Sequence, residues 1–544
     1  MKKIIQTGLC IVLFTCLILQ GTFAETGQNS KIFPTKQGVS VDKIWTITFN
    51  NDISLDKIEN ISILKDNQNI DKEVAVISSK KISVDSINNY EYETTYLLNI
   101  TLVNGKSYSM EFITEEDSAA NENIQIMHQQ AKGIVYSNLG KDLSENLTQV
   151  EVDTITSLNL SQINLEDISF LKYFRNLETL KLSSNLISDI NSLSNLSKLK
   201  DLDLTSNSIS NISPIENLVN LNILRISSNY VLSDISSISG LSNLTELYLF
   251  NNNISNLSAI NGLLKLQKLD LNTNKITSLE SLSGLNNLTY LNINSNKIGS
   301  IDGIGSLNNL TYLDIGNNEI SDIEALKDIT KLNTLRIYNN KITNISNLSN
   351  LTELYTLQMN NNLVEDISSL SNLTKINTIN IGENKISNID ALVNMNYMME
   401  LKMYNNSISD ISSLNNLINI KTLDASGNNI SDISNLIKLT KLENLNLNQN
   451  QIVSIQALND MVNMIELEIN NNLLTAIDAI EDMTKLSKLD ISYNSIKDAT
   501  PIINLVNKKS SYYKLYTLNI TESGITKDDL PQDIQSKIIN IICW

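Results

Sequence analysis

The fold is decided by the stretch Leu445-Asn446-Leu447-Asn448-Gln449-Asn450-Gln451-Ile452, whose pattern L-x-L-x-x-N-x-I recurs along the chain. Its asparagine returns at 15 positions, and every step is 22 residues except one of 23. The positions are Asn185, Asn207, Asn229, Asn252, Asn274, Asn296, Asn318, Asn340, Asn362, Asn384, Asn406, Asn428, Asn450, Asn472 and Asn494. Degenerate copies carry Ile163 and Ser523 instead. Chance does not keep register over so many copies, so the chain is built from repeats.

Each repeat has the sequence of a short strand followed by a turn. In one copy Leu202 and Leu204 alternate with polar residues, which predicts a strand with one buried face. Asn207 follows in the turn, where its amide can bond backbone groups. Stacked copies bring these asparagines together as a buried ladder. A period in the twenties with this spacing is typical of the leucine-rich repeat.

The period also predicts the shape of the coil. A return path within 22 residues is too short for a long helix, so 3₁₀ turns and extended segments are expected on the convex side. The fold class is therefore an α/β-type leucine-rich repeat solenoid with a curved parallel sheet. Residues 156–525 supply about 17 coils. One coil cannot bury its own leucines, so the ends of the array need caps.

Composition narrows the function further. The 544 residues carry a formal charge of -18, and glycine and proline are scarce, which argues against disorder. An acidic chain lacks the basic stripe that nucleic-acid binding needs. Much of the acidity belongs to the repeat itself, where Asp189, Asp322, Asp410 and Asp432 are expected to cap local backbone groups.

Residues 1–24 have the pattern of a secretory signal peptide. Lys2 and Lys3 precede an apolar run from Ile11 to Leu19, and Thr22-Phe23-Ala24 offers small residues for cleavage. The run is shorter than the ~20 residues of a membrane span. A lipoprotein with Cys16 is the alternative, although the residues before Cys16 match poorly. Cleavage leaves 39 basic and 59 acidic residues and only one cysteine, Cys543, so no internal disulfide is expected.

Residues 25–114 form a β-rich domain ahead of the repeats. Trp45, Ile47 and Phe49 alternate with threonines, and Asn104-Gly105 is a good hairpin turn. Several short strands in this length predict a small β-sandwich. The segment resembles the Ig-like modules of bacterial surface proteins, and an unrelated β spacer is the other interpretation.

Residues 115–155 read as a linker followed by a helical N-terminal cap. From Asn123 the apolar residues Ile124, Met127, Ala131, Ile134 and Val135 keep helical spacing, and Thr148 with Glu151 forms a capping box. Residues 526–544 are the expected C-terminal cap. There Pro531 starts a predicted helix whose apolar side carries Ile534, Ile538, Ile541 and Ile542.

With these residues in place, a family resemblance can be stated. The unit L-x-x-L-x-L-x-x-N-x-I-S-D-I-x-x-L resembles that of the internalins and related secreted leucine-rich repeat proteins of Gram-positive bacteria, over about residues 140–525. The resemblance implies a secreted or cell-surface protein that binds a host or envelope protein on its concave face. Internalins usually carry the Ig-like domain after the repeats, and here the β-rich segment precedes them. A sortase signal is also missing.

The candidate ligand-binding residues are large side chains among the mostly small or polar strand positions. They are Tyr248, Phe250, Tyr290, Tyr312, Arg336, Tyr338 and Tyr404. Tyr290 and Tyr312 occupy one column in adjacent strands, roughly 4.8 Å apart. Exposed tyrosine, phenylalanine and arginine are typical of binding hot spots. Cross-strand aromatic pairs also stabilise a sheet, so a purely structural role is the alternative.

No enzyme is predicted. His128 is the only histidine and lies in the cap, the usual nucleophile–base pairs are absent, and no metal or cofactor site is expected. The alternative to a ligand-binding protein is a structural scaffold for envelope assembly. The mature chain is expected to be a monomer without a membrane span. One irregularity stands out: Asn494 to Ser523 is seven residues longer than the period, and residues 506–518 there are basic and aromatic.

Overall fold

The structure is a computed structural model that describes residues 13–15, 30–41, 43–49, 54–86, 90–91, 94–103, 105–115, 123–510 and 512–543. The chain divides into two compact units, Met1–Asn123 and Ile124–Trp544. The predicted signal peptide lies outside the described residues, apart from Leu13–Thr15. Among the described residues, no helix has the length and apolar character that a membrane crossing requires.

Unit 1 is a β-sandwich, as predicted. One sheet has the order β1-β3-β7-β6 and the other β2-β9-β8-β4-β5. The elements are β1 (Leu13–Thr15), β2 (Ser30–Val39), β3 (Trp45–Thr48), the 3₁₀ turn Leu55–Lys57, β4 (Ile58–Lys65), β5 (Gln68–Asn69), β6 (Lys72–Ser78), β7 (Lys81–Ser86), β8 (Thr95–Leu102) and β9 (Ser107–Thr114). Trp45 of one sheet packs on Phe112 of the other, with ring centroids 4.9 Å apart. The alternation that starts at Trp45 therefore builds the core between the sheets.

Unit 2 is a leucine-rich repeat solenoid with one parallel sheet of 18 strands in the described chain, ordered as in the sequence. The strands are β10 (Ser157–Asn159), β11 (Thr179–Lys181), β12 (Asp201–Asp203), β13 (Ile223–Arg225), β14 (Glu246–Tyr248), β15 (Lys268–Asp270), β16 (Tyr290–Asn292), β17 (Tyr312–Asp314), β18 (Thr334–Arg336), β19 (Thr356–Gln358), β20 (Thr378–Asn380), β21 (Glu400–Lys402), β22 (Thr422–Asp424), β23 (Asn444–Asn446), β24 (Glu466–Glu468), β25 (Lys488–Asp490), β26 (Thr517–Asn519) and β27 (Asn540–Ile542).

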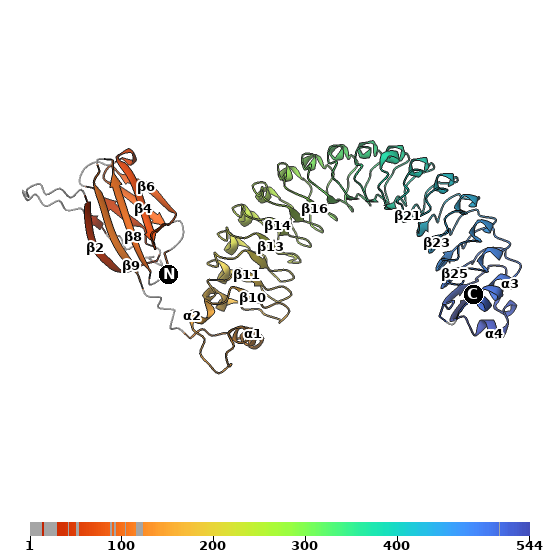
Figure 1. The fold of residues 1–544 in the computed structure, drawn as a ribbon, viewed down its shortest axis with the longest axis horizontal. Helices are drawn as coiled ribbons and strands as arrows, with labels where there is room; N and C mark the ends of the chain where they lie inside the picture. Colours follow the sequence, from red (N-terminus) through yellow and green to blue (C-terminus); the bar gives the residue numbers. More distant parts are fainter. Residues whose placement is uncertain are drawn as a thin grey trace, which may run out of the picture. The chain divides into compact units, whose positions relative to one another are not determined.

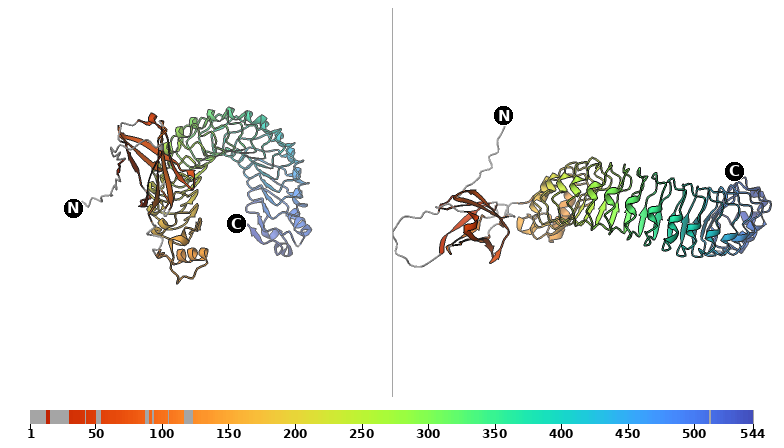
Figure 2. Two further views of the ribbon diagram at one scale, coloured as in Figure 1. Left: turned by 60° about the vertical axis from the view of Figure 1, so that its left-hand side comes forward. Right: turned by 90° about the horizontal axis from the view of Figure 1, so that it is seen from above.

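Strict register carries the leucines into one core. Leu445, for example, lies opposite Leu423 on one side and Leu467 on the other. These columns are almost completely buried. Figure 1 shows the strands stacked along the arc of this unit with short helical turns on its outer side, and Figure 2 shows the same stack from two other directions. The predicted solenoid and its 3₁₀ convex side are confirmed.

The convex turns are 3₁₀ helices of three residues in most coils. From the first full coil to the one before the long helix near the end, they are Asn191–Leu193, Ser213–Ile215, Ser236–Ile238, Ser258–Ile260, Glu280–Leu282, Asp302–Ile304, Glu324–Leu326, Ser346–Leu348, Ser368–Asn372, Asp390–Leu392, Ser412–Leu414, Ser434–Leu436, Gln456–Leu458 and Asp478–Ile480. The Ser169–Tyr173 and Lys527–Asp529 turns flank this series. Asp432 Oδ1 accepts from the Ser434 amide at 2.8 Å, so the predicted aspartate caps form.

The asparagine ladder is present and joins each coil to the one before it. Asn450 Oδ1 accepts from the Ile430 amide at 3.0 Å. Its Nδ2 donates to the carbonyl of Ala425 in the preceding coil at 3.0 Å and to that of Leu447 in its own coil at 3.1 Å. Both ends of one amide are thus used on backbone groups that the short strands leave without partners. The ladder differs at the 23-residue step. There Asn252 accepts from the backbone amide of the preceding ladder residue, Asn229, whereas Asn450 accepts from an amide two residues after the preceding ladder asparagine.

The N-terminal cap forms with a later helix start than predicted. Helix α1 (Gln129–Leu139) begins only after His128, whose Nδ1 accepts from the Ala131 amide at 3.3 Å. Met127 is therefore not on a buried helical face, and it is 82% exposed. Helix α2 (Gln149–Val152) has the predicted capping box. The prediction failed at the helix start because helical spacing alone does not locate an N-cap.

The C-terminal end also differs from the prediction. Helix α4 (Gln532–Gln535) has only four residues, and Asn540–Ile542 continue the sheet as β27. Ile541 and Ile542 therefore do not share a helical face with Ile534. The backbone of this segment bonds along the last strand, where the Asn540 amide donates to the Tyr516 carbonyl at 2.9 Å. Sheet pairing with a neighbouring coil replaced the local helical preference.

The longer step before the last coils contains a helix, α3 (Thr500–Lys508), where most other coils have a 3₁₀ turn. After it the chain is fixed by Lys509. Its Nζ donates to the carbonyls of Thr484 and Leu486 at 2.8 and 2.5 Å. Burial lowers the pKa of the Lys509 amine from 10.5 to about 8. A buried ammonium is disfavoured because it loses hydration.

This shift predicts a pH-dependent stability. Lys509 stays protonated up to pH 10.5 in the unfolded chain but only up to about pH 8 in the folded chain. The free-energy cost of burying the charged amine is therefore fully present below pH 8, and it is relieved as the pH rises from 8 to 10.5. The unfolding free energy of the wild type relative to Lys509→Met should therefore increase between pH 8 and 10.5. Denaturant titrations across that range measure it. Lys508→Met is the control, because pairing with Asp482 raises the pKa of Lys508 and predicts no such gain.

Candidate functional site

The concave side of the solenoid presents three columns of side chains in each coil. In each coil these are the residues before, between and after the two inward-facing leucines of the strand. The strand register places equivalent residues of adjacent coils side by side, which makes each position a column. The seven predicted residues all lie in these columns and are all partly buried. The structure brings four of them, Tyr290, Tyr312, Arg336 and Tyr338, into one cluster.

Tyr290 and Tyr312 are stacked as their shared column predicts. Their ring centroids are 4.4 Å apart and their planes differ by 11°. Arg336 of the next strand lies over the Tyr312 ring, 5.6 Å from its centroid, and donates from Nη1 to the Tyr312 hydroxyl at 3.0 Å. The same guanidinium is 3.7 Å from a carboxylate oxygen of Asp314. Arg336 Nε is buried and has no hydrogen-bond partner among the described residues.

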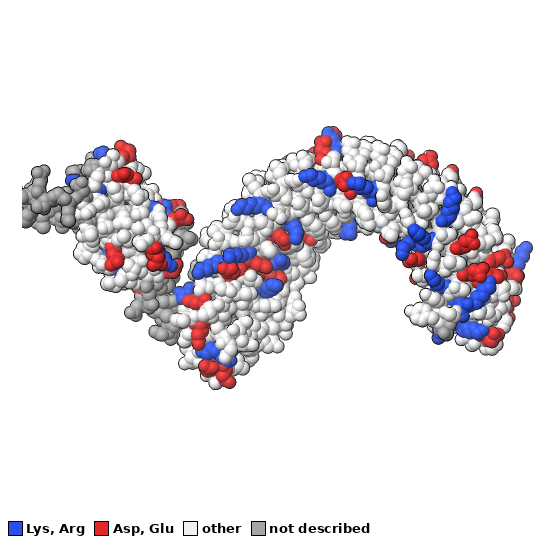
Figure 3. Space-filling view, viewed as in Figure 1, with Lys and Arg blue, Asp and Glu red and all other residues white. Residues whose placement is uncertain are grey.

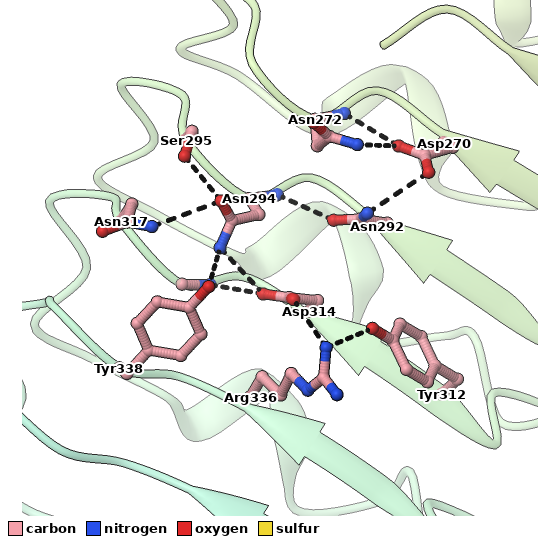
Figure 4. Close-up of polar contacts among 11 residues, drawn as sticks. Asp270, Asn272, Asn292, Asn294, Ser295, Tyr312, Asp314, Asn317, Arg336 and Tyr338 are labelled. Carbon is pink, nitrogen blue, oxygen red and sulfur yellow. Dashed lines mark hydrogen bonds and ion pairs between the residues drawn. The ribbon is translucent and has the colours of Figure 1, made fainter.

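Tyr338 joins this cluster through Asn294, two coils earlier (Figure 4). Asn294 Nδ2 donates to the Tyr338 hydroxyl at 2.8 Å and to Asp314 Oδ1 at 3.1 Å. The ring of Tyr338 reaches back across Gly316, where a Cβ would come within 2.7 Å of it. The absence of a side chain at Gly316 is therefore what lets the ring lie against the preceding coil.

Tyr404 repeats this arrangement three coils further on. Its ring covers Gly382, where a Cβ would lie 2.5 Å away. The structure places Tyr404 apart from the Tyr290–Tyr338 cluster, since two whole coils, those of β19 and β20, come between Tyr338 and it. It is a separate half-buried aromatic on the same surface.

Tyr248 forms a smaller group on the other side of the cluster. Arg225 lies over its ring at 5.5 Å, and the Tyr248 hydroxyl donates to Glu246 Oε2 at 2.8 Å. Arg225 also pairs with Asp201 at 2.6 Å, and not with the Asp203 beside it in the middle column. Phe250 is partly buried in the following column of the same coil.

Burial shifts the pKa of several polar groups in the cluster and beside it. Burial raises the pKa of the Tyr248 and Tyr312 phenols to about 12, and it also raises that of the Asp270 carboxyl. The phenols are therefore neutral at physiological pH and can donate or accept hydrogen bonds. Arginine, neutral phenols and amides that are fixed by one another therefore present hydrogen-bond donors and acceptors on this surface.

Sequence reasoning missed the residues that hold the cluster together. Asn294, Asp314 and Gly316 were not in the predicted site. One signal could have found the glycine: Gly316 precedes Tyr338 by 22 residues and Gly382 precedes Tyr404 by the same interval. A glycine one period before a tyrosine marks a ring that lies across the preceding coil.

Charges elsewhere on the solenoid mostly occur as pairs between neighbouring coils. Figure 3 shows lysines and arginines beside acids on the visible face. Lys200 with Glu178 and Lys421 with Glu443 are each 2.8 Å apart. Exposed pairs of this kind contribute little stability. No group of three or more His, Cys, Asp or Glu side chains in the described ranges is placed to hold a metal ion.

Comparisons with known proteins agree with the leucine-rich repeat fold. A family model described as leucine-rich repeats in two copies matches residues 242–284, 286–328, 330–372 and 418–460. The crystal structure of an internalin, InlF of Listeria monocytogenes, is 33% identical, with a TM-score of 0.54 over 62% of this chain and 94% of that one. A leucine-rich repeat protein of Leptospira interrogans has the same fold at 24% identity, with a TM-score of 0.61 over 66% and 96%. Comparison with curated sequences gave no match.

Proposed function

Because this chain belongs to the internalin family of leucine-rich repeat proteins, we propose that its concave face binds a protein ligand. The binding residues are Tyr248, Phe250, Tyr290, Tyr312, Arg336, Tyr338 and Tyr404. The ligand is a host or envelope protein, and the chain acts without catalysis or cofactor.

The observation that carries this proposal is the cluster around Arg336. Its tyrosines and arginine are the residue types on which binding energy concentrates. Stacking and hydrogen bonds already fix Tyr290, Tyr312 and Arg336, so little side-chain entropy remains to be lost on binding.

The remaining parts of the chain fit an exported protein. We propose that residues 1–24 are a cleaved signal peptide, residues 25–114 an Ig-like domain, 115–155 the linker and cap, 156–525 the repeat array, and 526–544 the second cap. The mature chain would be secreted or held at the cell surface as a monomer. Fractionating the producing culture into medium, wall and membrane, with detection of the mature N-terminus, tests the localisation and the cleavage together.

The ligand-binding proposal predicts a specific loss on substitution. Replacing both Tyr290 and Tyr312 with serine should weaken ligand binding by at least about tenfold, because it removes the centre of the aromatic surface. Partners captured from host-cell membranes or from the producer's own envelope are identified, and their affinities are compared between variants. Stability should fall as well, because the substitutions remove the stacking contribution of about 0.5–1.5 kcal/mol together with the burial of two half-buried rings.

The matched control is Tyr230→Ser, which removes a tyrosine that is 69% exposed and lies outside the strands. It should leave affinity unchanged. If the Tyr290 and Tyr312 double variant binds like the wild type while its stability drops, the stack is structural and the concave-face proposal is wrong. Capture only of the producer's own envelope proteins, with no effect of the double variant, would favour the scaffold role.

A further inference from the structure

A second surface lies where the repeat period is broken. The described chain between α3 and β26, residues 509–510 and 512–516, has no counterpart in the other coils, and it lies against the strand borders of β24 and β25. The Tyr516 amide donates to the Ser487 carbonyl at 2.8 Å just before β26 begins. This segment therefore lies beside the sheet and apart from the Tyr290–Tyr338 cluster.

The segment is held firmly at its start. Lys509 bonds two carbonyls, as described above, and Lys508 Nζ is 3.0 Å from Asp482 Oδ1. On α3, Asn504 Nδ2 donates to Glu481 Oε1 at 2.9 Å, and Asn507 Oδ1 accepts from Lys537 Nζ at 2.8 Å. These bonds tie α3 and the start of the segment to the coil before it and the cap after it.

A hollow of about 330 Å³ lies between this segment and the adjoining coils. Tyr512, Tyr513 and Tyr516 of the segment line it, together with Ile465 of the adjoining coil. Tyr512 is 83% exposed, and its ring meets that of Tyr513 edge to face at 5.0 Å. The volume is near the lower end of the roughly 300–1,000 Å³ of known ligand sites, which are concave, mostly apolar and carry a few polar groups.

The charges around the hollow favour an acidic occupant. Among the described residues that line it, the one carboxylate, Glu443, already pairs with Lys421 at 2.8 Å. Lys485 Nζ donates to the neutral Asn463 at 2.7 Å, and exposed Lys514 stands on the segment itself. Neither of these two lysines has an ion-pair partner in the described part of the chain. A net positive site in a chain of charge -18 is selective for anionic groups.

We propose that this hollow binds an acidic peptide segment of a partner protein, with one aromatic or aliphatic side chain seated among the three tyrosines. The carboxylates of the peptide pair with Lys485 and Lys514. The site is independent of concave-face binding, so the protein can engage one partner at two places or two partners at once. Engagement of one partner at both places raises its affinity by making the second contact intramolecular.

The probe is a blocked peptide of alternating glutamate and aspartate around one central phenylalanine, titrated calorimetrically into the full-length protein. A matched peptide with glutamine and asparagine in place of the acids measures the contribution of charge. A second peptide with a central glycine measures the contribution of the phenylalanine side chain. Tyr512→Ser and Lys514→Glu should each weaken binding of the acidic peptide by at least about tenfold. Both positions are exposed, so the variants should fold, and denaturant titration checks this.

Two controls make the result specific. Lys438→Glu changes the same charge at an exposed site elsewhere, and it should leave peptide binding unchanged. The Tyr290 and Tyr312 double variant should also bind the peptide normally, which distinguishes this site from the concave face. The proposal is overturned if the acidic peptide does not bind, if the amide peptide binds equally well, if Lys514→Glu has no effect, or if a single-stranded oligonucleotide binds here in preference to the peptide.

Discussion

Replacing Asn450 with alanine should lower the free energy of unfolding by about 1–3 kcal/mol, the cost of leaving a buried polar group without a partner. The substitution removes an acceptor from the Ile430 amide and a donor from the Ala425 and Leu447 carbonyls. These groups lie between stacked coils, where water cannot replace the lost amide without disturbing the stack.

The loss should also be local. Stability in a solenoid is nearly a sum over neighbouring coils, so amide hydrogen exchange should speed up around Ile430 and Asn450 and change little near the N-terminal cap. Denaturant titration gives the global change. Asn261→Ala is the control, because the Asn261 side chain is exposed and has no hydrogen bond among the described residues. An equal effect of both substitutions would show that the ladder contributes nothing beyond an ordinary surface asparagine.

Gly303→Ala should be destabilising by about 1–3 kcal/mol, the usual cost of overpacking a close contact. A Cβ at Gly303 would lie 2.1 Å from the carbonyl oxygen of Leu279 in the preceding coil, and the nearest atoms are all backbone. Rotation of a side chain therefore cannot relieve the clash. The preceding coil is also unusual, because its 3₁₀ turn ends with Ser283 extended and Gly284 at a φ of +99°.

Gly262→Ala is the matched control. It lies in another convex turn, where a Cβ would meet only the Ser239 carbonyl oxygen at 4.0 Å. That substitution should be neutral or slightly stabilising, because alanine restricts the unfolded chain. Denaturant midpoints of the two variants measure the contrast. A stable Gly303→Ala protein would mean that the two coils separate at little cost, and the close approach at Leu279 would then not constrain the curvature.

The repeat made most of the fold predictable. A leucine such as Leu445 is buried because its period places it in the same column in every coil, and that follows from spacing alone. The asparagine ladder follows in the same way. The predictions that failed were at the ends, at Met127 and at Ile541 and Ile542, where no repeat exists and the choice between helix, loop and strand depends on neighbouring coils.

The sequence predicted which column of the sheet each candidate residue occupies, but it did not predict most of the contacts between them. The spacing placed Tyr290 against Tyr312, and the stack was found there. It did not place Asn294 against Tyr338, since these residues are 44 apart and meet only because Gly316 leaves space between them. Likewise, the basic and aromatic composition of residues 506–518 was visible, whereas the hollow beside Ile465 was not.

The period, the strand register, the buried leucine columns and the ladder follow from the amino-acid sequence, because each depends on contacts between equivalent positions one period apart. Which irregular side chains meet depends on the folded arrangement of the coils. Those contacts depend on the curvature of the stack, on which side chain is missing at Gly316 and Gly303, and on how Lys509 fixes the inserted segment. A repeating pattern specifies what all coils share, and specificity resides in the positions where coils differ.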